Sequence, residues 1–229
     1  MARRRDLVRW VGDLGWREPP AFAAAPMEAA SSSVSGPSDC AGLAELAAFL
    51  DGCTRCALAE KRQHIVFGEG DAQAAVMFVG EAPGKEEDRT GRPFVGQAGK
   101  LLDGMIFALG FERSEVYIAN VVKCRPPGNR DPKEPEKAAC APFLDRQIEL
   151  IRPSVLVALG KPAAQRLTGS TKAIGALRGH WLSYRGIPLL ATYHPAYLLR
   201  NPNGKRTVWE DLKRVAERLK TGGNPPSSS

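Results

Sequence analysis

Side chains that can accept, donate or transfer protons lie within or directly after four short apolar runs of the 229-residue chain. They are Glu81 after Gly80, Asn120, Lys161 after Gly160, and His194. Groups of these types do the general acid–base and hydrogen-bonding work of enzymes. Each one alone is explained equally well as a turn cap or a surface residue. It is their shared position behind apolar runs that indicates a functional site.

The apolar runs have the length and composition of buried strands: AAVMFVG, VYIANVV, SVLVALG and IPLLATY. Amphipathic stretches such as AGKLLDGMIFAL and EKAACAPFLDRQIELI separate them. This alternation between Ala74 and Tyr193 predicts an α/β fold, a three-layer α/β/α sandwich around a mostly parallel, four-stranded sheet. Ligands of such sheets bind beyond the carboxyl ends of the strands, so the four polar positions should face one crevice.

Five cysteines form a second pattern. Cys53 and Cys56 make a C-x-x-C pair, Cys124 ends a predicted strand, and Cys140 falls in the following amphipathic stretch. A reducing cytoplasm disfavours disulfides, and a buried structural thiol is the ordinary explanation for any one cysteine. Four thiolates with no histidine nearby suit either zinc or a [4Fe-4S] cluster. The residues alone leave that choice open.

The composition is that of a globular protein with a basic surface. The chain has 43% hydrophobic residues and a net charge of +7, from 32 Lys and Arg against 25 Asp and Glu. Such a balance favours polyanionic partners such as nucleic acid. No apolar run approaches the roughly 18 residues of a membrane span, and the basic start has no signal-type apolar core. We therefore expect a cytoplasmic protein.

Low-complexity sequence sets the predicted domain limits. Residues 20–38 are rich in Ala, Ser and Pro and lack the large apolar residues of a core, so they are expected to be a linker. The predicted organisation is a basic arm, or a short docking helix, with this linker at 1–38, a domain at 39–220 and a frayed tail at 221–229. The domain should open with a helix from about Asp39 to Leu50 that Ser38 or Asp39 caps.

Three motifs together resemble the family-four uracil-DNA glycosylases, the thermostable iron–sulfur branch of that superfamily. They are GEAPGKEEDRTGRPFVGQAGKLLD, NVVKCRPPGNR and HPAYLLRN, in this order and with the cysteines described above. The resemblance covers about Leu46 to Leu219. It implies an enzyme of base excision repair that flips uracil out of DNA and hydrolyses its N-glycosidic bond.

The resemblance also implies a cofactor. It favours a structural [4Fe-4S] cluster over zinc, with four ligands: Cys53, Cys56, Cys124 and Cys140. Cys40 lies in the N-terminal extension, where the resemblance ends, and is expected to stay outside the ligand set.

The resemblance assigns the catalytic roles to two strand-end residues. Glu81 would orient or deprotonate the attacking water and offset the positive charge that develops on the sugar. His194 would donate a hydrogen bond to uracil O2, where negative charge accumulates as the bond breaks, and a neutral imidazole suffices for that role. The main chain of Gly80, Glu81 and Ala82 would approach the base, because glycine permits close contact.

Three further residues would recognise the base. Phe94 would stack on its face. Asn120 would accept from N3–H and donate to O4, whereas cytosine presents the reverse pattern. Glu87 would fill the space next to C5 of the base and so exclude the methyl group of thymine.

The expected partner is uracil-containing DNA, single- or double-stranded, bound by a monomer. Candidate DNA contacts lie in the third motif or just after it: Tyr197, Leu198, Leu199, Arg200, Lys205 and Arg206. The three apolar residues either offer a wedge to the base stack or begin a helix and pack inward, and the three cations would contact phosphates.

Other interpretations compete with this one. A family-five enzyme would lack a carboxylate at Glu81. A relative that traps DNA covalently would carry a histidine in the insertion after the Asn120 motif, and KCRPPGNRDPKEPEKAAC has none. A relative with another deaminated-base preference remains open. An iron–sulfur or zinc protein that binds nucleic acid without glycosylase activity would have no need of Glu81, Asn120 and His194 together.

Overall fold

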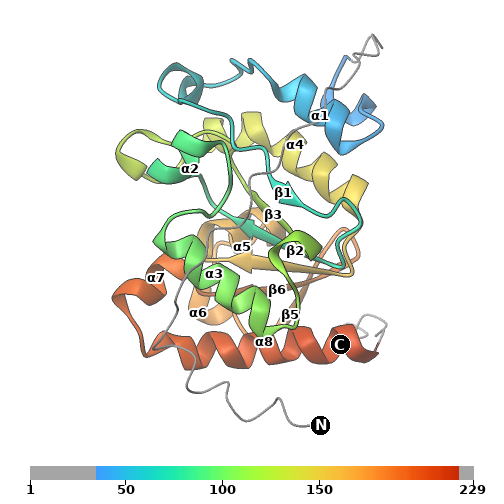
Figure 1. Cartoon of the computed structure of the whole chain (residues 1–229), viewed down its shortest axis with the longest axis vertical. Coiled ribbons are helices and arrows are strands. Elements are labelled where there is room, and N and C mark those ends of the chain that lie inside the picture. The colour runs from blue at the N-terminus through green and yellow to red at the C-terminus, as the bar shows by residue number, and fades with distance from the viewer. Residues whose placement is uncertain (1–34, 222–229) are drawn as a thin grey trace. The chain divides into compact units, whose positions relative to one another are not determined.

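The computed structural model describes residues 35–221 (Figure 1). The predicted arm, most of the linker and the last eight residues of the tail lie outside this range, so the domain limits stay a prediction. Within it, a central sheet has six strands in the order β1-β3-β2-β4-β6-β5. They are β1 (Glu69–Gly70), β2 (Val76–Gly80), β3 (Tyr117–Asn120), β4 (Val155–Leu159), β5 (Trp181–Tyr184) and β6 (Ile187–Thr192).

The predicted α/β sandwich is confirmed, with two strands more than the four expected. The four central strands, β3, β2, β4 and β6, are parallel, and the short edge strands β1 and β5 pair antiparallel. β1 has only two residues and carries no periodic pattern. The β5–β6 hairpin turns at Arg185 and Gly186, both at positive φ, and Arg-Gly is not among the usual hairpin signals.

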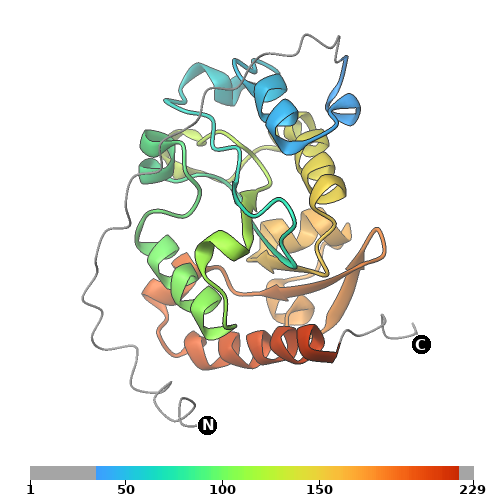
Figure 2. The same ribbon diagram turned by 45° about the vertical axis from the view of Figure 1, so that its right-hand side comes forward.

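Helices cover both faces of the sheet, and both cores are apolar. The cover on one face is α4 (Glu134–Ile151), α5 (Lys161–Thr168) and α6 (Ile174–Leu177), and on the other α3 (Gln97–Ala108), α7 (Pro195–Arg200) and α8 (Gly204–Thr221). Figures 1 and 2 show α8 on the side of the sheet away from α1. Along β2, Met77 and Val79 enter the first core and Val76 and Phe78 the second, as the two-residue period of a strand requires.

The first helix begins later than predicted. α1 spans Leu43–Leu50, with Gly42 and not Ser38 or Asp39 as its N-cap. The Asp39 carboxylate instead accepts from the Gly36 amide at 3.0 Å, in a 3-10 turn at Pro37–Asp39. Cys40 follows this turn and is fully buried against α1 and α4, which explains it as a core residue.

Parallel pairing brings the polar strand ends to one edge of the sheet. Gly80 of β2 stands opposite Asn120 of β3, and Leu159 of β4 opposite Thr192 of β6, two residues before His194. Among the short elements, α2 (Lys85–Thr90) follows β2 and the 3-10 turn Pro127–Asn129 follows β3, whereas the 3-10 turns Ala57–Glu60 and Arg113–Glu115 precede β1 and β3. No helix in residues 35–221 is long and apolar enough to cross a membrane.

Candidate active site

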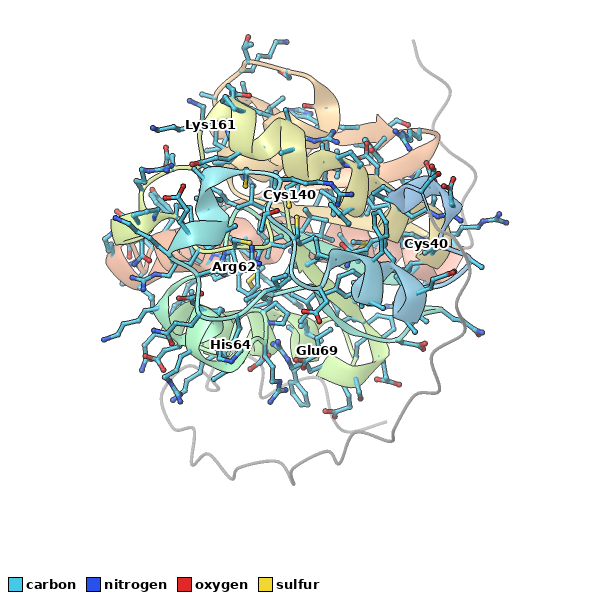
Figure 3. All side chains as sticks on the ribbon, turned by 90° about the horizontal axis from the view of Figure 1, so that it is seen from above. Cys40, Arg62, His64, Glu69, Cys140 and Lys161 are labelled. Atoms are coloured by element: carbon cyan, nitrogen blue, oxygen red, sulfur yellow. The ribbon has the colours of Figure 1, made fainter. Side chains whose placement is uncertain are left out.

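A pocket of about 440 Å³ opens at the carboxyl edge of the sheet. Its lining includes six residues named from the sequence for the base or the chemistry: Glu81, Ala82, Glu87, Phe94, Asn120 and His194. Tyr197 and Arg200 also line it, whereas Lys161 does not and lies exposed at the start of α5 (Figure 3). Of the four strand ends predicted to converge, those of β2, β3 and β6 therefore contribute side chains to this pocket, and the prediction does not hold for the end of β4.

Two buried oxygens in this pocket have no hydrogen-bond partner among the described residues. They are Oε1 of Glu81 and Oδ1 of Asn120. Buried polar atoms in folded proteins are nearly always paired, because an unpaired one costs about 1–3 kcal/mol. Their place in the pocket indicates that these two atoms serve a ligand rather than the fold.

Gly80 lies beneath the pocket and lets these groups approach one another. A side chain at this position would collide with Asn120 Oδ1 and with the ring of Phe94. The ladder between β2 and β3 also continues past their ends: Val121 N donates to Gly80 O at 2.9 Å and Val122 N to Glu81 O at 3.1 Å. The main chain of Glu81 is therefore fixed by regular pairing.

The Glu81 carboxyl is poised to exchange a proton near neutral pH. Burial raises its pKa, the negative charge of Asp131 raises it further, Lys137 opposes both, and the result is about 7. Asp131 lines the same pocket, on the segment that follows the 3-10 turn at Pro127–Asn129. A carboxylate with a pKa near the working pH is suited to general base catalysis.

His194 is held as a neutral donor. Its Nδ1 accepts from the Ala196 amide at 3.1 Å, capping α7, so in the neutral ring the proton is on Nε2. Burial lowers its pKa, the charge of Arg200 lowers it further against a small opposing effect of Glu87, and the result is about 4. At neutral pH the imidazole can thus donate from Nε2 without carrying charge.

Phe94 is held in a strained position beside this histidine. Its φ is 50°, in the left-handed region that few non-glycine residues adopt, and its ring centroid lies 5.6 Å from that of His194. Arg113 donates to the carbonyls of Pro93 and Phe94 and is itself paired with Asp103 at 2.7 Å. Sequence reasoning missed Arg113, which lies 19 residues beyond Phe94 and in no motif.

Glu87 uses its carboxylate to tie the loop together. Oε1 accepts from the amides of Val95 and Gly96, both at 2.9 Å, and Oε2 accepts from Gly84 at 3.1 Å. Glu87 lines the pocket, as a residue that excludes the C5 methyl would, but its oxygens are committed to the main chain. A side chain at Gly84 would lie 2.7 Å from Glu87 Oε2, so this carboxylate would have to move from its present position.

The sequence left two alternatives for the segment after His194, an exposed wedge or a helix that packs inward, and each holds for some of its residues. It is a helix, and Leu198 packs inward with 3% exposure, so its assignment as a DNA contact is wrong. Tyr197 and Leu199 face outward, 38% and 48% exposed. Arg200 and Arg206 are exposed and Lys205 is partly so, which leaves these three cations free to meet phosphates.

Comparison with known proteins agrees with this geometry. The family model of the uracil DNA glycosylase superfamily matches residues 67–213. A type-4 uracil-DNA glycosylase of Sulfurisphaera tokodaii is 48% identical over 174 residues, which are 72% of this chain and 79% of the relative. One from Thermotoga maritima is 47% identical over 177 residues, 75% of this chain and 91% of the relative.

The chain belongs to the type-4 uracil-DNA glycosylases. A type-5 uracil-DNA glycosylase of Pyrobaculum aerophilum is less similar, 35% identical over 167 residues, 65% of this chain and 72% of the relative. The lower similarity to this type-5 enzyme agrees with the presence of a carboxylate at Glu81, because a family-five enzyme would be expected to lack one.

In this type-4 chain the four predicted ligand cysteines lie near one another. Cys124 and Cys140 are buried, and Cys53 and Cys56 are half-buried. Burial raises the pKa of the Cys140 thiol, the charge and amide of Lys123 oppose this, and the charges of Cys56 and Cys53 raise it by smaller amounts. Burial likewise raises that of Cys124, to about 11, against the opposing charge of Arg62 and with smaller effects of Cys140 and Cys56. Each thiol therefore lies within electrostatic reach of others.

Two donors point at these sulfurs. The Lys123 amide donates to Cys140 Sγ at 3.3 Å, and Arg62 Nη1 contacts Cys124 Sγ at 3.6 Å and the Cys53 carbonyl at 2.5 Å. Figure 3 shows Arg62 and Cys140 near the centre of the molecule and Cys40 to one side. Among residues 35–221, no three His, Cys, Asp or Glu side chains surround one metal-ion position.

A second hollow, of about 510 Å³, lies between α8 and β5. Its lining is Trp181 and charged side chains of α8, among them Lys213 and Glu210, which pair at 2.6 Å. Neither of the two unpartnered buried oxygens lies there. The smaller pocket at the strand ends is therefore the site.

Proposed function

We propose that this protein excises uracil from DNA by hydrolysing the N-glycosidic bond, leaving an abasic site. The proposal rests on two buried oxygens, on Glu81 and Asn120, that have no hydrogen-bond partner within residues 35–221. They line the same pocket as a neutral histidine, His194. Uracil matches this arrangement: Asn120 Oδ1 accepts from N3–H while the amide group donates to O4.

The chemistry follows from the same groups. As the bond between C1′ and N1 breaks, its electron pair moves to the uracil ring, and His194 Nε2–H donates to O2 where the charge gathers. Glu81 takes a proton from the water that attacks C1′, and its negative charge stabilises the positive sugar. Phe94 stacks on the ring and holds it in place without reading its edge.

The four cysteines are proposed to hold a [4Fe-4S] cluster. Sulfurs that share one zinc ion stand about 3.8 Å apart, given bonds of about 2.3 Å. Thiols that influence one another without surrounding a single ion position fit a cluster better, because each ligand then binds a different iron. The cluster would join the Cys53–Cys56 segment, the end of β3 and α4, which is a structural role.

The DNA duplex or single strand would lie across the mouth of the pocket. Arg200, Lys205 and Arg206 would contact phosphates, and Tyr197, which lines the pocket, or Leu199, which is also exposed, would occupy the space left by the flipped base. We expect a monomer that acts in the cytoplasm.

Excision from a uracil-containing oligonucleotide, detected as strand cleavage at the abasic site under alkali, tests the proposal. Wild-type protein should cleave at uracil and leave matched thymine and cytosine oligonucleotides intact. Asn120→Asp loses the donor to O4 and should slow single-turnover excision at least a hundredfold. The control is Gln73→Glu, the same amide-to-carboxylate change at an exposed residue before the start of β2, which should act as wild type. Intact uracil strands after prolonged incubation with cluster-loaded protein would reject the proposal.

A further inference from the structure

Lys123 is a fully buried lysine that the proposed chemistry does not use. Its exposure is 0%, and an ammonium group is rarely buried unless something pairs with it. Its Nζ donates to the main-chain oxygen of Asn120 at 2.9 Å and to Gln147 Oε1 at 2.5 Å. No carboxylate among the described residues forms an ion pair with it.

Gln147 anchors this ammonium group in the core. Its amide donates to the Phe67 carbonyl at 2.9 Å and to the Tyr117 hydroxyl at 3.2 Å, and the side chain is itself fully buried. Tyr117 begins the strand that Asn120 ends. The lysine therefore connects the end of β3 to α4 through hydrogen bonds that water does not compete for.

The main chain of Lys123 reaches the thiolate site. Its amide donates to Cys140 Sγ at 3.3 Å, and the next residue is Cys124, another proposed ligand. One residue thus contacts the thiolate site through its main chain and the base-reading asparagine through its side chain. A ligand-reading group must be held within about 0.5 Å of its productive position by such supporting contacts.

We propose that Lys123 is a positioning residue, which holds Asn120 in place for uracil and makes that position depend on the thiolate site. The inference rests on the proposed function, because it takes Asn120 as the residue that reads the base. A lysine serves where an apolar side chain would not, since the Asn120 carbonyl would otherwise be buried next to it without this donor.

The test compares Lys123→Met with the exposed control Lys172→Met, both as cluster-loaded protein. Three quantities are measured: the Kd for free uracil, the Kd for a uracil-free oligonucleotide and the iron content per chain. Lys123→Met should weaken uracil binding about tenfold or more while the other two stay within twofold, and Lys172→Met should change none of them. Uracil binding within twofold of wild type in Lys123→Met would overturn the proposal.

Gln147→Met keeps the inference testable if the lysine variant does not fold. It removes one acceptor and leaves the bond from Lys123 to Asn120, so uracil binding should weaken less, and the two substitutions should not be additive in the double variant. A residue with only a packing role would lower the Tm and leave the uracil Kd unchanged at temperatures far below it, which would overturn the proposal.

The dependence on the thiolate site has its own spectroscopic test. Free uracil should alter the visible circular dichroism of the thiolate-to-iron bands in wild type and not in Lys123→Met. A wild-type spectrum that uracil leaves unchanged would refute that dependence. Wild type that neither binds nor excises uracil would instead refute the proposed function.

Discussion

At the scale of single residues, Glu81 is the group whose protonation should set the pH dependence of the reaction. As a base it must be ionised, and its pKa is raised to about 7. The single-turnover rate of excision should therefore rise about tenfold per pH unit below 7 and level off above it. His194, with a pKa of about 4, stays neutral across this range and adds no inflection.

Two neighbours of Glu81 offer variants that move this inflection in opposite directions. The negative charge of Asp131 raises the pKa of Glu81 and the positive charge of Lys137 lowers it. Asp131→Asn should thus shift the inflection to lower pH, and Lys137→Met to higher pH, in single-turnover profiles from pH 5 to pH 9. Profiles that coincide with wild type in both variants would exclude Glu81 as the titrating base.

Residue identities at the site were predictable because each follows a strand, but their states were not. Glu81, Asn120 and His194 stand behind apolar runs that the sequence displays. The tautomer of His194 depends on the Ala196 amide, and the raised pKa of Glu81 depends on burial and on the charge of Asp131, 50 residues away. Such contacts follow from the tertiary fold, so no local sequence pattern predicts them.

At the scale of elements, the Glu87 carboxylate helps to hold the loop between β2 and α3 in place. The carboxylate collects three main-chain donors from two segments, at Gly84 and at Val95 and Gly96, next to the strained Phe94. The sequence favoured Glu87 as a barrier to the C5 methyl of thymine. The contacts of the carboxylate favour a role in shaping the loop.

Glu87→Ala separates these two roles. If Glu87 shapes the loop, the variant should lose at least tenfold in uracil excision and gain no activity on thymine, because Phe94 is displaced. If it excludes the methyl group, the variant should begin to excise thymine. Oligonucleotides with uracil or mispaired thymine at one position provide the measurement, and Glu86→Ala, an exposed neighbour paired with Arg89 at 3.1 Å, is the control.

The sequence predicted the strands whose apolar pattern results from burial in the core. It did not predict the start of the first helix, which depends on capping, or the two strands at the edges of the sheet. The four parallel strands are buried on both faces and appear as continuous apolar runs. β1 and β5 lie at edges and have no such run. The start of α1 was misplaced because Asp39 can cap two different turns, and the chain uses it for the earlier one.

At the scale of the whole molecule, the proposed cluster would connect segments that are far apart in sequence. Cys140→Ser should lose most of the cluster and lower the Tm, because a site with three thiolates binds the remaining iron weakly. Wild type should contain about four irons per chain and absorb broadly in the visible. Cys40→Ala, a buried cysteine outside the ligand set, should keep its iron even if it loses some stability. Equal iron in both variants would show the ligand assignment to be wrong.

Positively charged side chains lie at both edges of the sheet, and their positions allow a test of where DNA binds. Arg200 lines the pocket at the carboxyl edge, whereas Arg185 lies in the β5–β6 turn at the opposite edge, before the start of β6. A phosphate contact releases about one counterion, so losing it weakens binding to every sequence and flattens the salt dependence.

Arg200→Ala should therefore weaken binding to uracil-free and uracil-containing oligonucleotides alike and reduce the slope of log Kd against log salt by about one unit. Arg185→Ala, its matched control, should leave the slope unchanged, since its partners Glu149 and Asp145 lie away from the pocket. Fluorescence anisotropy at four salt concentrations measures both. If the two variants lost affinity equally, DNA would not be bound at the carboxyl edge, and the pocket there could not receive a flipped base.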